Sequence, residues 1–251
     1  DNGQYVFNYY WNFAGTSLPS GWINNGMSVT VNNGVTLTPS GSVGTDSRDS
    51  ITFASVNFYG MSYVFETYTK VTTLGIADIN PAMIINSNST TAYSTNDNIV
   101  NDGFDISGST PNYYNDVQIS SGTVNRYSIT PPSGYSYSSF NIYEIYINGA
   151  TGGPAVDYSS ILNTETDYNP STQYIAIGSW VGSSAPTTFT QWARVRAYPP
   201  NGVMPSFNIT NALSISINNP ISSTNIDQVN TSYTIQSQPN YQVTLSFYIN
   251  S

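Results

Sequence analysis

The stretch MSVTVNNGVTLT, residues 27–38, decides the fold class, because apolar residues alternate with hydroxyl residues on both sides of an Asn-Asn-Gly turn. Alternation with a period of two buries one face of a β-strand and leaves the other polar. A short turn of Asn and Gly joins two such strands into a hairpin. The stretch therefore predicts a β-hairpin with one buried face.

The same period recurs along most of the chain, and no window of ten or more residues has the i, i+3, i+4 apolar spacing of a helix. Further strands are expected at residues 5–13, 63–71, 116–120, 126–130, 140–149 (which ends in an Asn-Gly turn), 174–177 and 191–198. Residues 85–97, rich in Ser, Thr and Asn, are expected to form a loop. Many short strands between polar turns predict an all-β, antiparallel sandwich.

Composition indicates where such a protein works. Only 8% of the residues are charged, and the chain has no histidine and no cysteine, against about 25% charged residues in an ordinary soluble protein. Because few groups titrate, we expect stability to be nearly constant from about pH 7 down to about pH 3. This composition suits an extracellular or cell-surface protein in acid. Asp1 opens directly into a strand-like segment, so we expect any signal peptide to have been removed.

The composition also excludes several function classes. Five Lys and Arg residues, a net charge of −9 and no basic stripe argue against nucleic-acid binding. No apolar run approaches the roughly 20 residues that span a bilayer. Without cysteine there are no disulfides or thiolate metal sites, and without histidine most nucleophilic triads are excluded.

Three segments resemble one known family. FAGTSLPSGW at 13–22 and VTVNNGVTL at 29–37 resemble the opening of concanavalin A-like lectin/glucanase (laminin-G-like) domains. QWARVRAYPP at 191–200 resembles the closing strand of such modules in large archaeal surface proteins. The resemblance spans residues 9–205 and implies a jelly-roll sandwich. The chain departs from the pattern at Asn12, where related modules often have Asp, and no metal or sugar ligands can be carried over.

The resemblance and a shift in composition divide the chain into two parts. We expect a concanavalin A-like sandwich over residues 1–205 and a short β appendage over 206–251. The appendage contains strand-like runs at 212–217, 232–235 and 242–249. It is too short for a complete sandwich, so it is either an incomplete immunoglobulin-like unit or an inter-subunit tail. An incomplete unit would pack on the main domain or be part of a longer chain.

Two glutamates are the candidates for catalysis. Glu66 and Glu144 lie within expected strands, and Glu144 shares its face with Phe140, Ile142 and Tyr146. The pair could therefore meet on an aromatic-lined sheet and hydrolyse a glycoside, which needs two carboxyl groups about 5–10 Å apart. Alternatively, they are surface glutamates paired with Lys70 or an arginine. The glucanase pattern E-x-D-x-x-E is missing.

Arg194 and Arg196 alternate along one strand, so both face the same side of the sheet. Pairing with the scarce carboxylates is the expected role, and ligand binding is the alternative. No cofactor is expected, with one exception. Asp97, Asp102 and Asp105 gather in one Asx-rich loop of the kind that Ca²⁺ prefers, although such residues also form ordinary solvated turns.

Aromatic residues and sequons suggest contact with sugars. Trp180 is expected in a flexible loop and Tyr146 in a strand, and each could stack on a glycan, although such rings more often fill a core. Asn88, Asn208 and Asn230 begin acceptor sequons for N-glycosylation.

Together these features predict a non-enzymatic extracellular protein that is structural or adhesive. Its unpaired strands would assemble a filament or a surface layer by β-strand addition. The first alternative is a lectin-like carbohydrate-binding module, and the second is a glycoside hydrolase that uses Glu66 and Glu144. The expected partners are further copies of the chain, and glycans in the alternatives, with no nucleic acid and no membrane span.

Overall fold

The computed structural model describes residues 7, 9–41, 47–85, 99–119, 123–149, 151–164 and 172–198. Within these ranges, the side chains of 47–48, 99–102, 117–119 and 123–124 are not described. The described part of the chain is all β, and no helix in it is long and apolar enough to cross a membrane. The predicted all-β class is confirmed.

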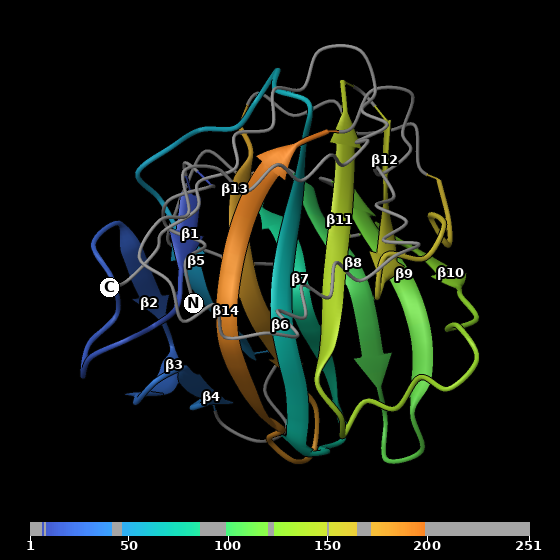
Figure 1. The fold of residues 1–251 in the computed structure, drawn as a ribbon. Coiled ribbons are helices and arrows are strands. Elements are labelled where there is room, and N and C mark those ends of the chain that lie inside the picture. The colour runs from blue at the N-terminus through green and yellow to red at the C-terminus, as the bar shows by residue number, and fades with distance from the viewer. Residues whose placement is uncertain are drawn as a thin grey trace, which may run out of the picture. The chain divides into compact units, whose positions relative to one another are not determined.

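Fourteen strands form two antiparallel sheets that lie one over the other, as Figure 1 shows. The first sheet, sheet A, has the spatial order β12 (Thr151–Val156), β11 (Asn141–Asn148), β6 (Tyr63–Thr73), β14 (Thr187–Ala197), β4 (Val35–Pro39) and β3 (Met27–Val31), with β1 (Tyr9–Trp11) also paired to β14.

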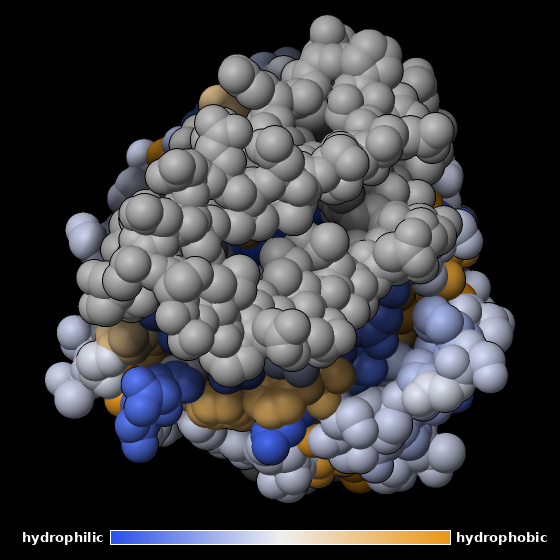
Figure 2. Space-filling model, in the orientation of Figure 1, coloured by the Kyte–Doolittle hydropathy of each residue, from blue (hydrophilic) through white to orange (hydrophobic). Residues whose placement is uncertain are grey.

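The second sheet, sheet B, has the spatial order β10 (Thr123–Ser128), β9 (Asn112–Ile119), β8 (Ile99–Ser107), β7 (Ala77–Ile85), β13 (Tyr174–Val181), β5 (Ser47–Phe53) and β2 (Trp22–Asn25). The two inner faces enclose one main hydrophobic core, to which Phe65, Ile79, Phe104 and Ile145 contribute fully buried side chains. Such face-to-face packing of antiparallel sheets defines a β-sandwich. Figure 2 shows that the described surface in this view mixes hydrophilic and weakly polar residues with small apolar areas.

The hairpin at residues 27–38 forms as its alternation predicts. β3 pairs with β4 from Met27↔Pro39 to Val31↔Val35. Asn33 has φ 48° and Gly34 has φ 137° in the turn between them. A Cβ on Gly34 would lie 2.4 Å from a Phe189 ring atom, so the residue allows both the turn and the close packing against β14.

Two expectations about local structure are wrong. Trp180 lies inside β13 rather than in a flexible loop, because its segment pairs with β7 and β5 on both sides. Residues 101–105 belong to β8 rather than to an Asx-rich loop, because β7 and β9 pair with this segment. In both cases non-local pairing overrides the turn propensity of Gly, Ser, Asn and Asp.

The N-terminal strand pairs within its own chain. Tyr9, Tyr10 and Trp11 oppose Val195, Arg194 and Ala193 of β14. This part of the N-terminal run therefore pairs with β14 of its own chain, and assembly through the N-terminal run stays a prediction.

The chain divides into two compact units, Asp1–Ser206 and Phe207–Ser251. The second unit lies outside the described residues, so the β appendage and assembly through it stay predictions. Asn88, Asn208 and Asn230 also lie outside the described residues, and their glycosylation stays a prediction.

Candidate active site

Glu66 and Glu144 are direct partners across two central strands of sheet A. β6 and β11 pair in a register that sets Glu66 opposite Glu144. Their neighbours along each strand, Phe65 and Ile145, point into the core, so both glutamates project from the outer face of the sheet. The predicted meeting of the two carboxyl groups therefore occurs. Residues directly opposite in an antiparallel pair have Cβ atoms about 4.5–5.5 Å apart.

Two arginines from the next strand hold this pair. Arg194 Nε donates a hydrogen bond to Glu66 Oε2, and Arg196 Nε donates to Glu66 Oε1 at 2.5 Å. Arg196 Nη2 also lies 3.3 Å from Glu144 Oε1. β14 supplies both side chains because it pairs with β6 on the side away from β11. The predicted pairing of these arginines with the scarce carboxylates is thus what the structure shows.

Glu144 has a different environment from Glu66. It accepts hydrogen bonds from Tyr146 Oη at 3.0 Å and from the Tyr158 backbone N–H at 2.8 Å. Burial, and secondly the negative charge of Glu66, raise the pKa of Glu144 to about 7. A carboxyl group of this kind holds a proton near neutral pH and can donate it.

The chain after β12 folds over the outer face of sheet A and covers the carboxyl pair. We call residues 157–164 the cover segment. Ile161 packs on a small apolar cluster formed by Val64, Tyr146 and Ala155. A Cβ on Gly153 would lie 2.0 Å from the Asn163 carbonyl oxygen, so the segment passes directly over β12. Both glutamate side chains are fully buried.

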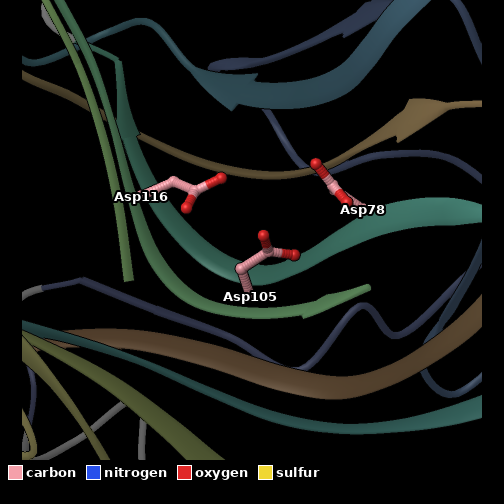
Figure 3. Close-up of side chains that lie close together, drawn as sticks. All are labelled: Asp78, Asp105 and Asp116. Carbon is pink, nitrogen blue, oxygen red and sulfur yellow. The ribbon is translucent and has the colours of Figure 1, made fainter. Parts of the chain in front are cut away.

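A second group of carboxylates lies on sheet B. Asp78, Asp105 and Asp116 come from β7, β8 and β9, and Figure 3 shows their carboxylates turned toward one another. Oxygen atoms of the three lie within 4.8 Å of one another. The guanidinium of Arg126, from β10, reaches them with Nη2 2.5 Å from Asp116, 2.8 Å from Asp78 and 3.7 Å from Asp105. Burial raises the pKa of Asp116, although Arg126 opposes this shift.

This group of carboxylates includes only one of the three residues that were predicted to bind Ca²⁺, Asp105. Asp97 lies outside the described residues and the Asp102 side chain is not described. Asp105 is buried, but its neighbours are Asp78 and Asp116 rather than the expected Asx loop. Carboxylate oxygens are suitable Ca²⁺ ligands, yet here the Arg126 guanidinium supplies positive charge among them. The use of Ca²⁺ stays a prediction.

Sequence reasoning missed four residues of these sites: Asp78, Asp116, Arg126 and Tyr158. Asp116 and Arg126 begin two consecutive expected strands and lie directly opposite each other in β9 and β10. Pairing these two strands as a hairpin could have predicted their contact. Asp78 and Tyr158 had no comparable signal, because their positions depend on strand order and on the course of the cover segment.

The two residues expected to contact sugars have specific surroundings. Tyr146 is buried, with its ring edge-on to Tyr198 and the Arg196 guanidinium 5.4 Å from the ring centroid. It therefore belongs to the hydrogen-bond network of Glu144. Trp180 lies opposite Asp78 across β13 and β7 and is partly buried. A glycan contact by either residue stays a prediction.

Comparisons with known proteins identify the fold. No family model matches the sequence, and no curated protein matches it. Among solved structures, the laminarinase catalytic domain of Thermotoga petrophila, an endo-1,3-β-glucanase, has a TM-score of 0.56 at 11% identity, covering 75% of this chain and 96% of that one. An endo-acting O-glycanase from human gut microbiota has a TM-score of 0.58 at 9% identity, covering 76% and 99%.

A third similar structure is an immunostimulatory antigen and pseudo β-1,3-glucanase of Mycobacterium tuberculosis, with a TM-score of 0.53 at 12% identity, covering 76% of this chain and 98% of that one. At such identities the likeness shows the fold alone, which is the jelly-roll sandwich of β-glucanases. The predicted concanavalin A-like fold is confirmed.

The comparisons contradict the prediction of a non-enzymatic structural or adhesive protein. The solved structures that share the fold over three quarters of the chain are mostly described as glucanases, laminarinases or other glycoside hydrolases. Composition led to the wrong expectation because a charge-poor surface reports the surroundings of a protein and not its chemistry.

Proposed function

We propose that the chain is a glycoside hydrolase that cleaves a β-linked polysaccharide, with Glu144 as the general acid and base and Glu66 as the nucleophile. The observation that carries the proposal is the direct opposition of two glutamates on one sheet face, in different electrostatic environments. Retaining glycosidases need carboxyl groups about 5–5.5 Å apart, one protonated and one ionised. Direct cross-strand partners have Cβ atoms about 4.5–5.5 Å apart, which is compatible with this requirement, and Glu66 accepts from two guanidinium groups.

The reaction would proceed in two steps. Glu144 gives its proton to the glycosidic oxygen while the bond from that oxygen to C1 breaks, and a Glu66 oxygen forms a bond to C1. Water then attacks C1 and passes a proton to Glu144. The bond between C1 and the Glu66 oxygen breaks, and Glu66 leaves as a carboxylate. The two arginines stabilise the Glu66 carboxylate before and after the covalent intermediate.

Access to the pair requires movement of the cover segment. Its residue Tyr158 contacts both halves of the network, because its backbone N–H donates to Glu144 and its hydroxyl accepts from Arg194 Nη2 at 2.7 Å. The Tyr158 residue is 44% exposed, so it can leave toward solvent. Opening at this point would bring a sugar onto both carboxyl groups.

The fold neighbours suggest which substrates to test first. Several are described as enzymes acting on β-1,3-glucan, and one as acting on mucin O-glycans. We propose a β-1,3-glucan as substrate and an extracellular site of action, which the charge-poor composition supports.

The decisive experiment measures reducing ends released from laminarin and from mucin O-glycans by the wild-type chain. Glu144→Gln and Glu66→Gln are expected to lower hydrolysis by roughly 10³-fold or more, since each removes a group that acts in the transition state. Azide should restore part of the activity of a Glu66→Ala variant by replacing the nucleophile. Absence of hydrolysis in the wild type on every glycan tested would refute the proposal.

The aspartate group on sheet B provides the alternative location for the same activity. Asp78→Asn and Asp116→Asn form matched variants, because each also exchanges one carboxylate for an amide beside an arginine. If these variants abolish hydrolysis and the two glutamate variants do not, the active site lies on sheet B and the assignment of Glu66 and Glu144 is wrong.

A further inference from the structure

Arg196 is the one arginine in the described part of the chain whose hydrogen bonds reach both glutamates. Its Nε donates to Glu66 Oε1 at 2.5 Å, whereas its Nη2 approaches Glu144 Oε1 only to 3.3 Å. The same Nη2 donates to Tyr146 Oη at 3.2 Å. The guanidinium is thus closer to one carboxylate than to the other.

The remaining contacts strengthen this asymmetry. Arg194 binds the second oxygen of Glu66, so each Glu66 oxygen accepts from a charged Nε. Glu144 accepts its two shorter hydrogen bonds from neutral donors, the Tyr146 hydroxyl and the Tyr158 N–H, and only the longer one, at 3.3 Å, from the charged Arg196 Nη2. Hydrogen bonds from charged donors favour the ionised form of a carboxyl group more strongly than those from neutral donors.

Two buried carboxyl groups on paired residues do not both ionise freely, because each charge disfavours the other. The pair therefore retains one proton over a range of pH, and the donors around it decide which glutamate carries that proton. The titratable and charged groups that face Glu144 are Glu66 from β6, Arg194 and Arg196 from β14, Tyr146 from β11, and Tyr158 from the cover segment.

We propose that Arg196 is a positioning residue that assigns the two glutamates their different roles, fixing Glu66 as the charged partner and leaving the single proton of the pair on Glu144. The inference rests on the proposed function for its catalytic meaning, but the placement of the proton can be measured without any substrate. Arg196 acts through the carboxyl groups, and no role is assigned to it in contact with the sugar.

The chain is well suited to a direct test, because it contains only three glutamates: Glu66, Glu144 and Glu165. Protein labelled with ¹³C at the glutamate carboxyl carbons will therefore show three carboxyl signals, which Gln variants assign. The signals are followed from pH 4 to pH 9 in the wild type, in Arg196→Lys and Arg196→Met, and in Arg126→Met. The last variant removes the same charge from sheet B and is the matched control.

In the wild type, the Glu144 signal is expected to titrate with a midpoint near 7, as its pKa of about 7 predicts. In Arg196→Met, the midpoint for Glu144 should rise by about 1 unit or more, the effect of losing a nearby opposite charge. The Glu66 signal should then also shift in the same transition, because the proton is shared.

Arg196→Lys keeps the charge without the planar fork and should change the Glu144 midpoint less than Arg196→Met does. Arg126→Met should leave both signals unchanged. The inference is overturned if Glu66 carries the proton in the wild type, or if both Arg196 variants titrate as the wild type does.

Failure of the inference and failure of the proposed function are distinguishable. Titration as expected without hydrolysis of any glycan would refute the proposed function alone. Hydrolysis that depends on Glu144, combined with an unchanged titration in the Arg196 variants, would refute the role of Arg196 alone.

Discussion

Asp157 and Tyr158 show how single residues hold the cover segment in place. Both have positive φ, 53° and 57°, which costs a residue other than glycine of order 1–3 kcal/mol. Asp157 offsets this cost by pairing with Ile142 twice, through its backbone N–H and through its carboxylate, each at 2.8 Å. Tyr158 offsets it through its hydrogen bond to Glu144. The turn is therefore tied to the strand that carries the proposed acid.

Trp11 provides a residue-scale prediction about the sandwich itself. Its ring centroid lies 4.5 Å from that of Phe53 and 5.2 Å from that of Trp22, so it joins β1 to the core. Trp11→Ala should lower the free energy of unfolding by about 3 kcal/mol, as for other truncations of core aromatic residues. Urea denaturation measures the loss. Tyr59→Ala, at a residue that is 52% exposed, should change it by less than about 0.5 kcal/mol.

Individual site residues were predictable from sequence only where strand alternation fixed their direction. Glu144 and Tyr146 face outward together, as a period of two requires, and so do Arg194 and Arg196. The position of Tyr158 was not predictable, since no sequence pattern indicates that a tyrosine will adopt a positive φ. At this scale alternation determines the direction of a side chain but not its partner.

At the scale of elements, the outer face of sheet A carries a row of aromatic rings across its strands. Tyr10, Trp192, Tyr68 and Phe140 follow one another with centroids 6.4, 5.5 and 4.7 Å apart and nearly parallel planes. The three successive ring pairs are stacked. Lys70 lies over Phe140. Stacked aromatic pairs on neighbouring strands stabilise a sheet, so the row contributes to the stability of sheet A.

Strand identity was largely predictable, but strand order was not. Alternation located the strands now called β3, β4, β6, β11 and β14, because apolar and polar residues alternate along much of each of them. It did not locate β8, whose Asn, Asp and Gly residues favour turns, or β12, which contains Gly152, Gly153 and Pro154. These strands form because their neighbours in the sheet satisfy their backbone groups.

Gly153 provides the prediction for the cover segment. A methyl group there would lie 2.0 Å from the Asn163 carbonyl oxygen and 2.7 Å from Ile161, so Gly153→Ala should displace the segment from β12. Labelling with a water-soluble carbodiimide and an amine nucleophile, read by mass spectrometry, should then modify Glu144 several-fold faster than in the wild type. Labelling requires no substrate and so reports access alone.

Gly60→Ala serves as the control for Gly153→Ala, because it strains the backbone at its φ of 79° but its Cβ has no neighbour within 4 Å to displace. It should leave the labelling of Glu144 at the wild-type rate. A folded Gly153→Ala protein with unchanged labelling would show that the cover segment does not limit access to the carboxyl pair.

At the scale of the whole molecule, two carboxylate groups lie on different sheets, and each contains a carboxyl group whose pKa is raised by burial. Glu144 is on sheet A and Asp116 is on sheet B. The low content of charged residues predicted a stability that hardly depends on pH. That expectation considers the number of titrating groups but not their burial, and burial is fixed by which strands become neighbours.

The sign of the pH dependence follows from the direction of these pKa shifts. A group with a raised pKa binds its proton more tightly in the folded chain, so its contribution to stability is complete below its ordinary pKa and is lost as the pH rises through the folded value. For Glu144 this window runs from 4.5 to about 7. Asp116 acts in the same direction, beginning at its ordinary value of 3.8.

We therefore expect the chain to lose stability as the pH rises from 4.5 to 8, by up to about 3 kcal/mol from Glu144 at roughly 1.4 kcal/mol per pKa unit. Thermal melting across this range measures the loss. Glu144→Gln cannot ionise, so its melting temperature should fall less over the same range and should equal or exceed that of the wild type at pH 8. Adding Asp116→Asn to Glu144→Gln should reduce the dependence of the melting temperature on pH further. A wild-type melting temperature that rises from pH 4.5 to 8 would contradict the raised pKa of Glu144 and, with it, the proton that the proposed acid has to donate.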